Sequence, residues 1–213
     1  MKDTREKILE AALELFRERG FAEATMREIA SRAGVATGLA YYYFKSKDAI
    51  VLAFYQRAKE DLATALDAAH ADTRLAGRLQ ALIEAKFRYF KPNRRFLGAL
   101  MAHAADAANP LSPFGEPSRD VREFDVAQFD RALVETNTRV PADLAPHLPK
   151  ILWIYQMGLL LFWIYDPSPN QRRTKALLEK SVDVVVMLIR LSGVPLMRPA
   201  RKRVLDIVGI IES

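Results

Sequence analysis

Residues 25–48 read TMREIASRAGVATGLAYYYFKSKD, and this stretch decides the fold. Thr25 followed by Glu28 three positions later is a capping box, which predicts the start of a short helix. Gly34 is expected to end that helix, because glycine tolerates the left-handed conformation of a helix C-terminus. After a two-residue turn, residues 37–44 are expected to form a second short helix. Two capped helices joined in this way have the dimensions of a helix-turn-helix.

A further helix is predicted on the N-terminal side of this motif. Asp3 and Glu6 form a second capping-box pattern. Apolar residues recur at helical spacing between positions 8 and 16, and Gly20 is expected to end the helix in a left-handed conformation. We therefore predict a three-helix domain over residues 1–47.

The rest of the chain is predicted to form a larger helical domain over residues 48–213. Ser46 is expected to cap a long helix that joins the two domains and that has an apolar residue at every fourth position from Ile50 to Leu66. Helical spacing predicts further helices over residues 73–90, 93–106, 118–137, 142–165, 171–191 and 204–211. No segment shows the alternating pattern of a strand, so the predicted fold class is all-α.

Composition narrows the function. The chain has 213 residues, a net charge of +6, three histidines and no cysteine. The lack of cysteine excludes disulfides, thiolate metal sites and a cysteine nucleophile, and it favours a cytoplasmic location. A phosphate-binding glycine loop, an HExxH motif and a GxSxG motif are all missing, and the histidines lie far apart. We therefore expect no catalytic residue, no metal and no cofactor.

Basic and aromatic residues concentrate in the predicted helix-turn-helix. Within residues 25–47 the basic residues outnumber the acidic one by three, with Arg27, Arg32, Lys45 and Lys47 against Glu28. Three consecutive tyrosines occupy positions 41–43. Successive side chains on a helix point about 100° apart, so the three rings cannot all face the core. We expect Tyr41 and Tyr42 to be exposed, and exposed tyrosines beside lysines favour nucleic-acid binding.

Residues 4–57 resemble the DNA-binding domain of the TetR family of transcriptional regulators. The resemblance rests on Ile8–Ala12, Leu15–Phe16, Gly20–Phe21, Thr25–Ala30, Ala33–Val35 and Gly38–Asp48. It implies a regulator, most often a repressor, that binds a palindromic double-stranded DNA operator as a homodimer. It implies DNA contacts at Thr25, Arg27, Thr37, Gly38, Leu39, Tyr41, Tyr42 and Lys47. It also implies that the C-terminal domain binds a ligand and dimerises.

Three positions depart from the pattern of this family. Ala36 stands where a serine often caps the recognition helix, so Thr37 is expected to take over and to shift the helix start by one residue. Thr37 also stands where a basic residue is common, and Leu39 cannot hydrogen-bond to a base. These departures keep an alternative open, namely a helical ligand-binding or interaction protein that has lost specific operator reading. An all-α enzyme is disfavoured by the missing catalytic motifs.

Two C-terminal helices are unusually apolar. Gln156 is the one polar side chain among the apolar and aromatic ones of residues 151–165, and residues 181–191 read SVDVVVMLIRL, with eight apolar residues of eleven. Together they have more apolar surface than one small core covers, which predicts a four-helix interface in a homodimer. The alternative is that they are two central helices of a monomer. A 15-residue helix spans about 22 Å, less than the ~30 Å hydrocarbon core, so no membrane partner is expected.

A ligand pocket is predicted between the helices of residues 75–165. The candidate lining residues are Phe87, Phe90, Phe96, Leu100, Met101, His103, Phe124, Phe129, Trp153, Met157 and Phe162. Few ionisable groups lie among them, so a small apolar or aromatic effector is expected, although each residue on its own is more often plain core. For the basic run at 198–203 a DNA contact is left open, and a solvated linker between helices is the expectation.

Overall fold

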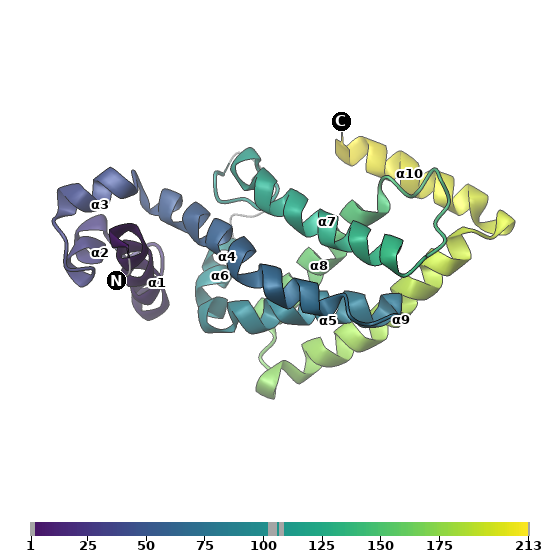
Figure 1. The fold of residues 1–213 in the computed structure, drawn as a ribbon, viewed down its shortest axis with the longest axis horizontal. Coiled ribbons are helices and arrows are strands. Elements are labelled where there is room, and N and C mark those ends of the chain that lie inside the picture. The colour runs from purple at the N-terminus through teal and green to yellow at the C-terminus, as the bar shows by residue number, and fades with distance from the viewer. Residues whose placement is uncertain (1–2, 102–105, 107–108, 213) are drawn as a thin grey trace. The chain divides into compact units, whose positions relative to one another are not determined.

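The computed structural model describes residues 3–101, 106 and 109–212. Every regular element in these ranges is helical (Figure 1), which confirms the predicted all-α fold. The α-helices are α1 Thr4–Arg19, α2 Met26–Arg32, α3 Thr37–Tyr43, α4 Lys47–Ala69, α5 Leu75–Phe90, α6 Arg94–Met101, α7 Arg119–Glu135, α8 Leu148–Tyr165, α9 Arg172–Ser192 and α10 Arg198–Glu212. Short 3-10 helices precede four of them: η1 Lys91–Asn93, η2 Glu116–Ser118, η3 Pro169–Gln171 and η4 Pro195–Met197.

The chain divides into two compact units. The first consists of residues 1–62 and 89–123, and the second consists of residues 63–88 and 124–213. Helices α4, α5 and α7 therefore contribute residues to both units. Helix α4 is continuous, and the domain boundary between residues 47 and 48 remains a prediction. The Oγ of Ser46 accepts a hydrogen bond from the N–H of Ala49 at 3.2 Å, so Ser46 caps α4 as predicted.

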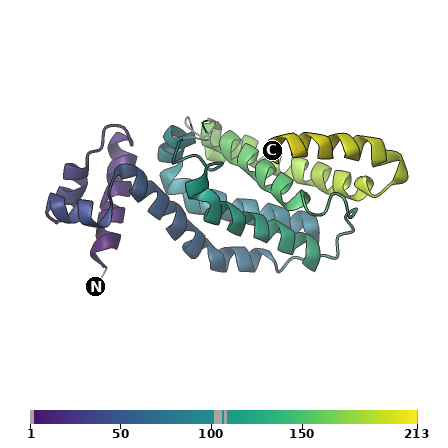
Figure 2. The same cartoon turned by 90° about the horizontal axis from the view of Figure 1, so that it is seen from above.

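A cluster of aromatic rings holds the first unit together. Phe16 of α1 stacks on Phe96 of α6, with ring centroids 5.0 Å apart. Phe54 of α4 lies 5.9 Å from Phe90 and 6.1 Å from Phe96. All four side chains are buried. The cluster anchors α1 to α4 and α6, and α2 and α3 lie beside α1 in both views (Figures 1 and 2).

Both predicted ends of α1 need correction. Asp3 occupies the N-cap position, but its side chain makes no capping hydrogen bond. Glu6 does not complete a capping box, because its carboxylate accepts a hydrogen bond from Arg57 instead. Gly20 ends the helix with φ +92° and ψ 160°, which is a positive φ but not the left-handed helical conformation.

A buried carboxylate joins the end of α8 to the start of α9 in the second unit. Asp166 accepts hydrogen bonds from the N–H of Ser168 at 2.9 Å and from the N–H and hydroxyl of Thr174 at 2.9 and 2.7 Å. Burial raises the pKa of Asp166, but these hydrogen bonds outweigh it and hold that pKa below its usual value. Further along the two helices, the hydroxyls of Tyr155 and Ser181 are 2.6 Å apart.

The prediction of a linker at 198–203 is wrong. The basic run forms the first turns of α10. Pro199 fits there because an N–H in the first turn of a helix has no partner within the helix. Arg201 donates from Nη1 to the carbonyl oxygen of Ser192 at 2.6 Å and from Nε to Asp143 at 2.9 Å. The arginine thus binds the C-terminal end of α9 rather than standing free in solvent.

Candidate nucleic-acid interface

The turn between α2 and α3 is closed by hydrogen bonds of the Schellman type. The N–H of Val35 donates to the carbonyl of Ala30 at 3.0 Å, and the N–H of Gly34 donates to the carbonyl of Ser31 at 3.1 Å. Gly34 has φ +68°, so a side chain at this position is strained. This geometry sets the direction in which α3 leaves the turn, and it matches the end of α2 predicted at Gly34.

The N-terminus of α2 carries the predicted capping box. The hydroxyl of Thr25 accepts from the N–H of Glu28 at 3.2 Å and donates to Glu28 Oε2 at 2.8 Å, while the N–H of Thr25 donates to the same oxygen at 2.9 Å. These hydrogen bonds lower the pKa of Glu28, so the carboxylate stays ionised. Because the Thr25 hydroxyl donates its one proton to Glu28, it can only accept a hydrogen bond from a further partner.

Helix α3 presents its polar and aromatic side outward. Thr37 and Gly38 are exposed, and Leu39, Tyr41 and Tyr42 are 40, 46 and 72% exposed. Ala40 and Phe44 on the other side are buried, which holds α3 against the unit. Ala36 is the N-cap without a side-chain hydrogen bond, so the predicted shift of the helix start to Thr37 as cap does not occur.

Gly38 offers a clean separation of stability from DNA binding. A Cβ built on Gly38 meets no atom within 4 Å, and its φ is not positive. Replacing Gly38 with alanine is therefore expected to stabilise the protein by about 0.5–1 kcal/mol, because alanine is the better helix former. If the backbone here lies close to DNA, the added methyl lowers operator affinity. Thermal melting and a gel-shift titration of Gly38→Ala measure the two effects, and unchanged DNA affinity contradicts the assigned contact.

The positive charges of the motif are not equally available. Arg32 is paired with Glu18 at 2.8 Å and with Glu14 at 3.4 Å. Lys47 donates from Nζ to the carbonyl oxygens of Phe21 and Ala22 at 2.6 and 3.0 Å. An ammonium has three N–H donors, so Lys47 keeps one for a phosphate.

Two further cations of this segment are open to a ligand. Arg27 and Lys45 are both exposed, and no hydrogen bond or ion pair ties them to the described part of the chain. Of the four basic residues of the motif, Arg27 and Lys45 are therefore open, Lys47 is partly used and Arg32 is paired with two carboxylates. Because Lys47 also holds the segment after α1, its substitution is expected to affect stability as well as DNA binding.

The predicted ligand-pocket residues are distributed over both units. In the first unit, Phe90, Phe96 and Leu100 are buried and Met101 is half-buried. In the second unit, Phe129 and Trp153 are buried, Phe87, Phe124 and Met157 are half-buried, and Phe162 is 42% exposed. His103 lies outside the described residues. The pocket itself remains a prediction, and the exposure of Phe162 argues against a lining role for that residue.

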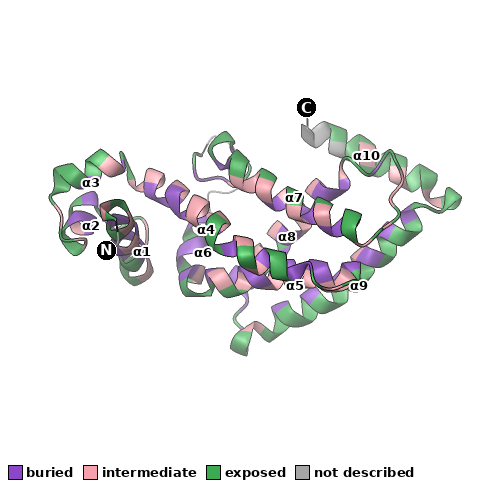
Figure 3. Cartoon of the chain, in the orientation of Figure 1, coloured by how far each residue is buried: buried purple, intermediate pink, exposed green. Residues whose placement is uncertain are grey.

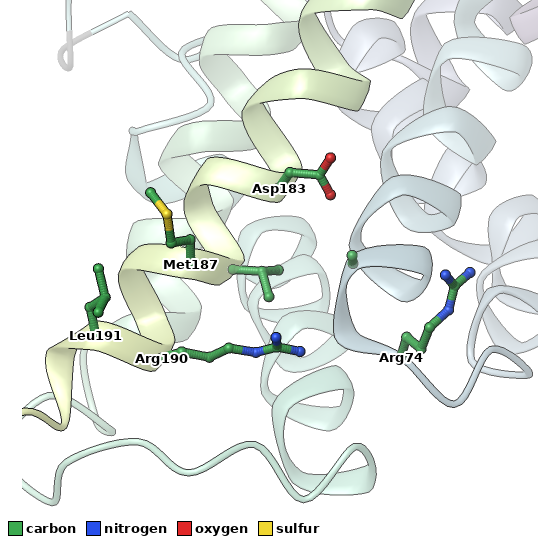
Figure 4. A pocket seen from close by; sticks show the side chains of 7 residues that line it. Arg74, Asp183, Met187, Arg190 and Leu191 are labelled. Atoms are coloured by element: carbon green, nitrogen blue, oxygen red, sulfur yellow. The ribbon is translucent and has the colours of Figure 1, made fainter.

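A hollow in the second unit is lined by residues other than the predicted pocket residues. It has a volume of about 480 Å³ and is lined by Arg74, Ala76, Asp183, Val186, Met187, Arg190 and Leu191. Figure 4 shows Asp183 and Arg190 of α9 pointing toward the segment around Arg74, whereas Met187 and Leu191 point away from that segment. None of the predicted pocket residues lines it. No grouping of three or more His, Asp or Glu suited to a metal occurs in residues 3–101, 106 and 109–212.

Buried charges in the second unit are a finding that sequence patterns did not predict. Lys86 of α5 forms an ion pair with Asp125 of α7, and each side chain is 9% exposed. Arg78 bonds to Glu135 and lies 3.4 Å from the ring nitrogen Nδ1 of His70. Burial lowers the pKa of His70. The expectation of few ionisable groups concerns the candidate pocket residues themselves and stays a prediction, although Lys86 and Asp125 directly adjoin Phe87 and Phe124 in the sequence.

Helices α8 and α9 each carry an exposed apolar stripe. The α8 stripe comprises Ile154, Gly158, Leu161, Phe162 and Tyr165, and the α9 stripe comprises Leu177, Val184, Met187, Leu188 and Leu191. Figure 3 shows much of α9 exposed. Helix α8 has 18 residues and is long and apolar enough for a membrane span, but half of it is buried, as in core helices of soluble proteins. These stripes are instead suited to contact another protein surface.

Comparison with known proteins agrees with this geometry. Residues 8–54 match the family described as "Bacterial regulatory proteins, tetR family", and residues 78–209 match "Tetracyclin repressor-like, C-terminal domain". The chain is 38% identical over 90 residues to the transcriptional activator FasR of Mycolicibacterium smegmatis, which is 42% of this chain and 41% of FasR. It is 24% identical over 197 residues to the transcriptional regulator AcrR of Shigella flexneri, covering 82% of this chain and 85% of AcrR.

The fold has solved counterparts as well. The regulator FadR of Bacillus subtilis, in complex with stearoyl-CoA, superposes with a TM-score of 0.66 at 17% identity, over 85% of this chain and 97% of FadR. Some curated relatives match over short stretches, and the chain spans 18 to 41% of the length of three of them. The C-terminal match alone covers more than half of the sequence, from residue 78 to residue 209. The chain therefore belongs to the TetR family of bacterial transcriptional regulators.

Proposed function

We propose that this regulator is a repressor that binds a palindromic operator as a homodimer and leaves it when a small apolar or aromatic effector binds. The observation that carries the proposal is the outward side of α3, where Leu39, Tyr41 and Tyr42 are exposed next to the open cations Arg27 and Lys45. Bases are read from such a helix in the major groove, and tyrosine hydroxyls and ammonium groups contact phosphates. We also propose a cytoplasmic location, because that is where the operator DNA of a bacterium lies.

The stripes on α8 and α9 support the homodimer. Their members recur at helical spacing, and their large apolar side chains are between 38 and 61% exposed. Pairing both helices with those of a second copy covers both stripes in one isologous four-helix contact. A dimer presents two α3 helices, which read half-sites about 34–36 Å apart on one side of the duplex.

The relatives support an effector without naming this one. The FadR structure contains stearoyl-CoA, which has a long apolar chain. Helix α4 runs without interruption from Lys47 to Ala69 and contributes to both units. We infer that effector binding in the second unit shifts α4 and so changes the separation of the paired α3 helices. A difference in effector affinity of about 1–3 kcal/mol between the two states is enough for this coupling.

A gel-shift titration with the DNA that flanks the gene of this protein tests the proposal. Specific binding is expected, with log affinity falling against log salt concentration at a slope of ~−0.9 for each neutralised phosphate. Binding without preference for any sequence favours the alternative, a helical ligand-binding protein that has lost operator reading. A reporter gene behind the bound segment then separates repression from activation.

A further inference from the structure

Two opposite charges on α9 have no partner within their own chain. Asp183 and Arg190 are exposed, and no hydrogen bond or ion pair ties either of them to the described residues. Both side chains line the hollow of the second unit and point toward the segment around Arg74 (Figure 4). The Arg74 guanidinium binds Asp72 at 3.3 Å instead. Helix α9 therefore presents an unpaired carboxylate and an unpaired guanidinium on one side.

The α9 stripe has the seven-residue spacing of paired helices. Three of its exposed members are seven residues apart and a fourth follows the middle one by three, namely Leu177, Val184, Leu191 and Met187. This is the spacing of the a and d positions in a seam between two helices, and Lys180 takes the remaining d position with its aliphatic stem. Asp183 and Arg190 each directly precede an a position, so both occupy g positions along one edge of the seam. The other edge, of e positions, lies toward α8, because the hydroxyls of Ser181 and Tyr155 are 2.6 Å apart.

The two charges distinguish between the ways in which two copies of α9 can pair. In a parallel pair, a g residue lies beside an e residue of the partner, so Asp183 meets Leu188 and Arg190 has no e residue beside it within α9. In an antiparallel pair related by a twofold axis across the helices, like edges come together and g meets g. With Val184 beside Met187 of the other copy, Asp183 and Arg190 of the other copy differ by two residues, or about 3 Å along the axis. The antiparallel pair thus brings opposite charges together.

We propose that Asp183 and Arg190 form two reciprocal ion pairs between antiparallel copies of α9 and that these pairs set the register of the homodimer. The twofold axis makes each pair occur twice. Sliding one helix by seven residues keeps the apolar seam, but it brings Asp183 beside Asp183 or Arg190 beside Arg190. Like charges at such a contact oppose the wrong registers. The inference rests on the homodimer of the proposed function, because the pairs exist only if α9 belongs to that contact.

Reversing one charge at a time tests the pairing. Asp183→Arg sets two cations against each other at both pairs, and Arg190→Asp sets two anions against each other. The dissociation constant of each variant homodimer is therefore expected to rise about tenfold or more. An equal mixture of the two variants restores opposite charges at both pairs, so a heterodimer is expected to form about as tightly as the wild-type dimer. Sedimentation velocity over a concentration series measures these constants.

The mixture distinguishes a contact between chains from one within a chain, because the two charges stay alike within each variant chain. The double variant Asp183→Arg/Arg190→Asp is expected to dimerise with itself but not with the wild type. Asp130→Arg is the matched control, since it makes the same exchange at an exposed residue of α7 and is expected to leave dimerisation unchanged. Circular dichroism checks the fold of each variant. Should a reversed chain not fold, a double-mutant cycle of Asp183→Asn and Arg190→Gln is expected to show coupled effects on the dissociation constant.

The outcomes separate this inference from the proposed function. If the wild type sediments as a monomer at every concentration, the homodimer of the proposed function fails and the ion pairs fail with it. If the wild type is a dimer and the single variants dimerise equally well, the ion pairs are wrong while the homodimer stands. The same conclusion follows if the mixture dissociates as readily as the single variants do, or if the effects of Asp183→Asn and Arg190→Gln simply add.

Discussion

Gly158→Arg is expected to turn the proposed dimer into a folded monomer that no longer binds its operator specifically. Gly158 lies within the α8 stripe, is exposed, and has no atom within 4 Å of a Cβ built on it. A side chain there is therefore harmless to the single chain, and arginine forms helix better than glycine by up to about 1 kcal/mol. In the dimer, however, the guanidinium is placed in an apolar contact between helices.

The expected loss of DNA binding is large because each subunit supplies only one reading helix. A monomer keeps the non-specific attraction to phosphates, which is about 10³-fold or more weaker than specific binding. Sedimentation velocity gives the oligomeric state and a gel shift gives the affinity. Ala127→Arg is the matched control, because it adds the same charge to another small exposed residue, on α7. A Gly158→Arg protein that sediments as a dimer shows that the α8 stripe is not the interface.

The helix-turn-helix was predictable because its signals are local. The Thr25–Glu28 capping box and the Gly34 turn involve residues three to five positions apart, and the structure shows both. The exposure of Tyr41 and Tyr42 followed from helical geometry alone. Family resemblance then supplied the DNA contacts, which remain predictions about individual side chains.

Long-range partners were not predictable from spacing. Glu6 looks like half of a capping box, yet its carboxylate binds Arg57, 51 positions away. A local pattern cannot show this competition, because an ion pair with a partly buried arginine outweighs a solvent-exposed cap. The start of α10 was missed for another reason. A basic run reads as a solvated segment, but one of its members, Arg201, satisfies the last carbonyl of α9.

Buried charge is the third kind of feature that the sequence conceals. Lys86 lies one helical turn after the buried Leu82 and Ile83 on α5, and its long aliphatic stem lies on the same buried side of the helix. The spacing of apolar residues is consistent with a buried position for Lys86, but it does not show which carboxylate binds the Lys86 ammonium. Asp125 is 39 positions further along the chain. The spacing of apolar residues therefore does not show that an ion pair lies in this interior.

Lys86→Ala is expected to destabilise the protein by about 3–5 kcal/mol. The substitution leaves the Asp125 carboxylate buried without its partner, since each side chain of the pair is only 9% exposed. Urea unfolding followed by circular dichroism measures the free energy of unfolding. Arg119→Ala is the surface control, because the Arg119–Glu116 pair is 54 and 71% exposed. Exposed pairs contribute about 0–1 kcal/mol, so the control is expected to change little.

Replacing both partners gives the opposite expectation. In Lys86→Met/Asp125→Leu neither charge is left alone, and the two apolar side chains fill a similar volume. The double variant is therefore expected to be as stable as the wild type or more stable, by up to about 4 kcal/mol. A Lys86→Ala protein no less stable than Arg119→Ala would mean that the ammonium and carboxylate are hydrated in solution. A double variant as unstable as Lys86→Ala would mean that methionine and leucine do not pack in the space of the pair, so that shape rather than charge decides stability there.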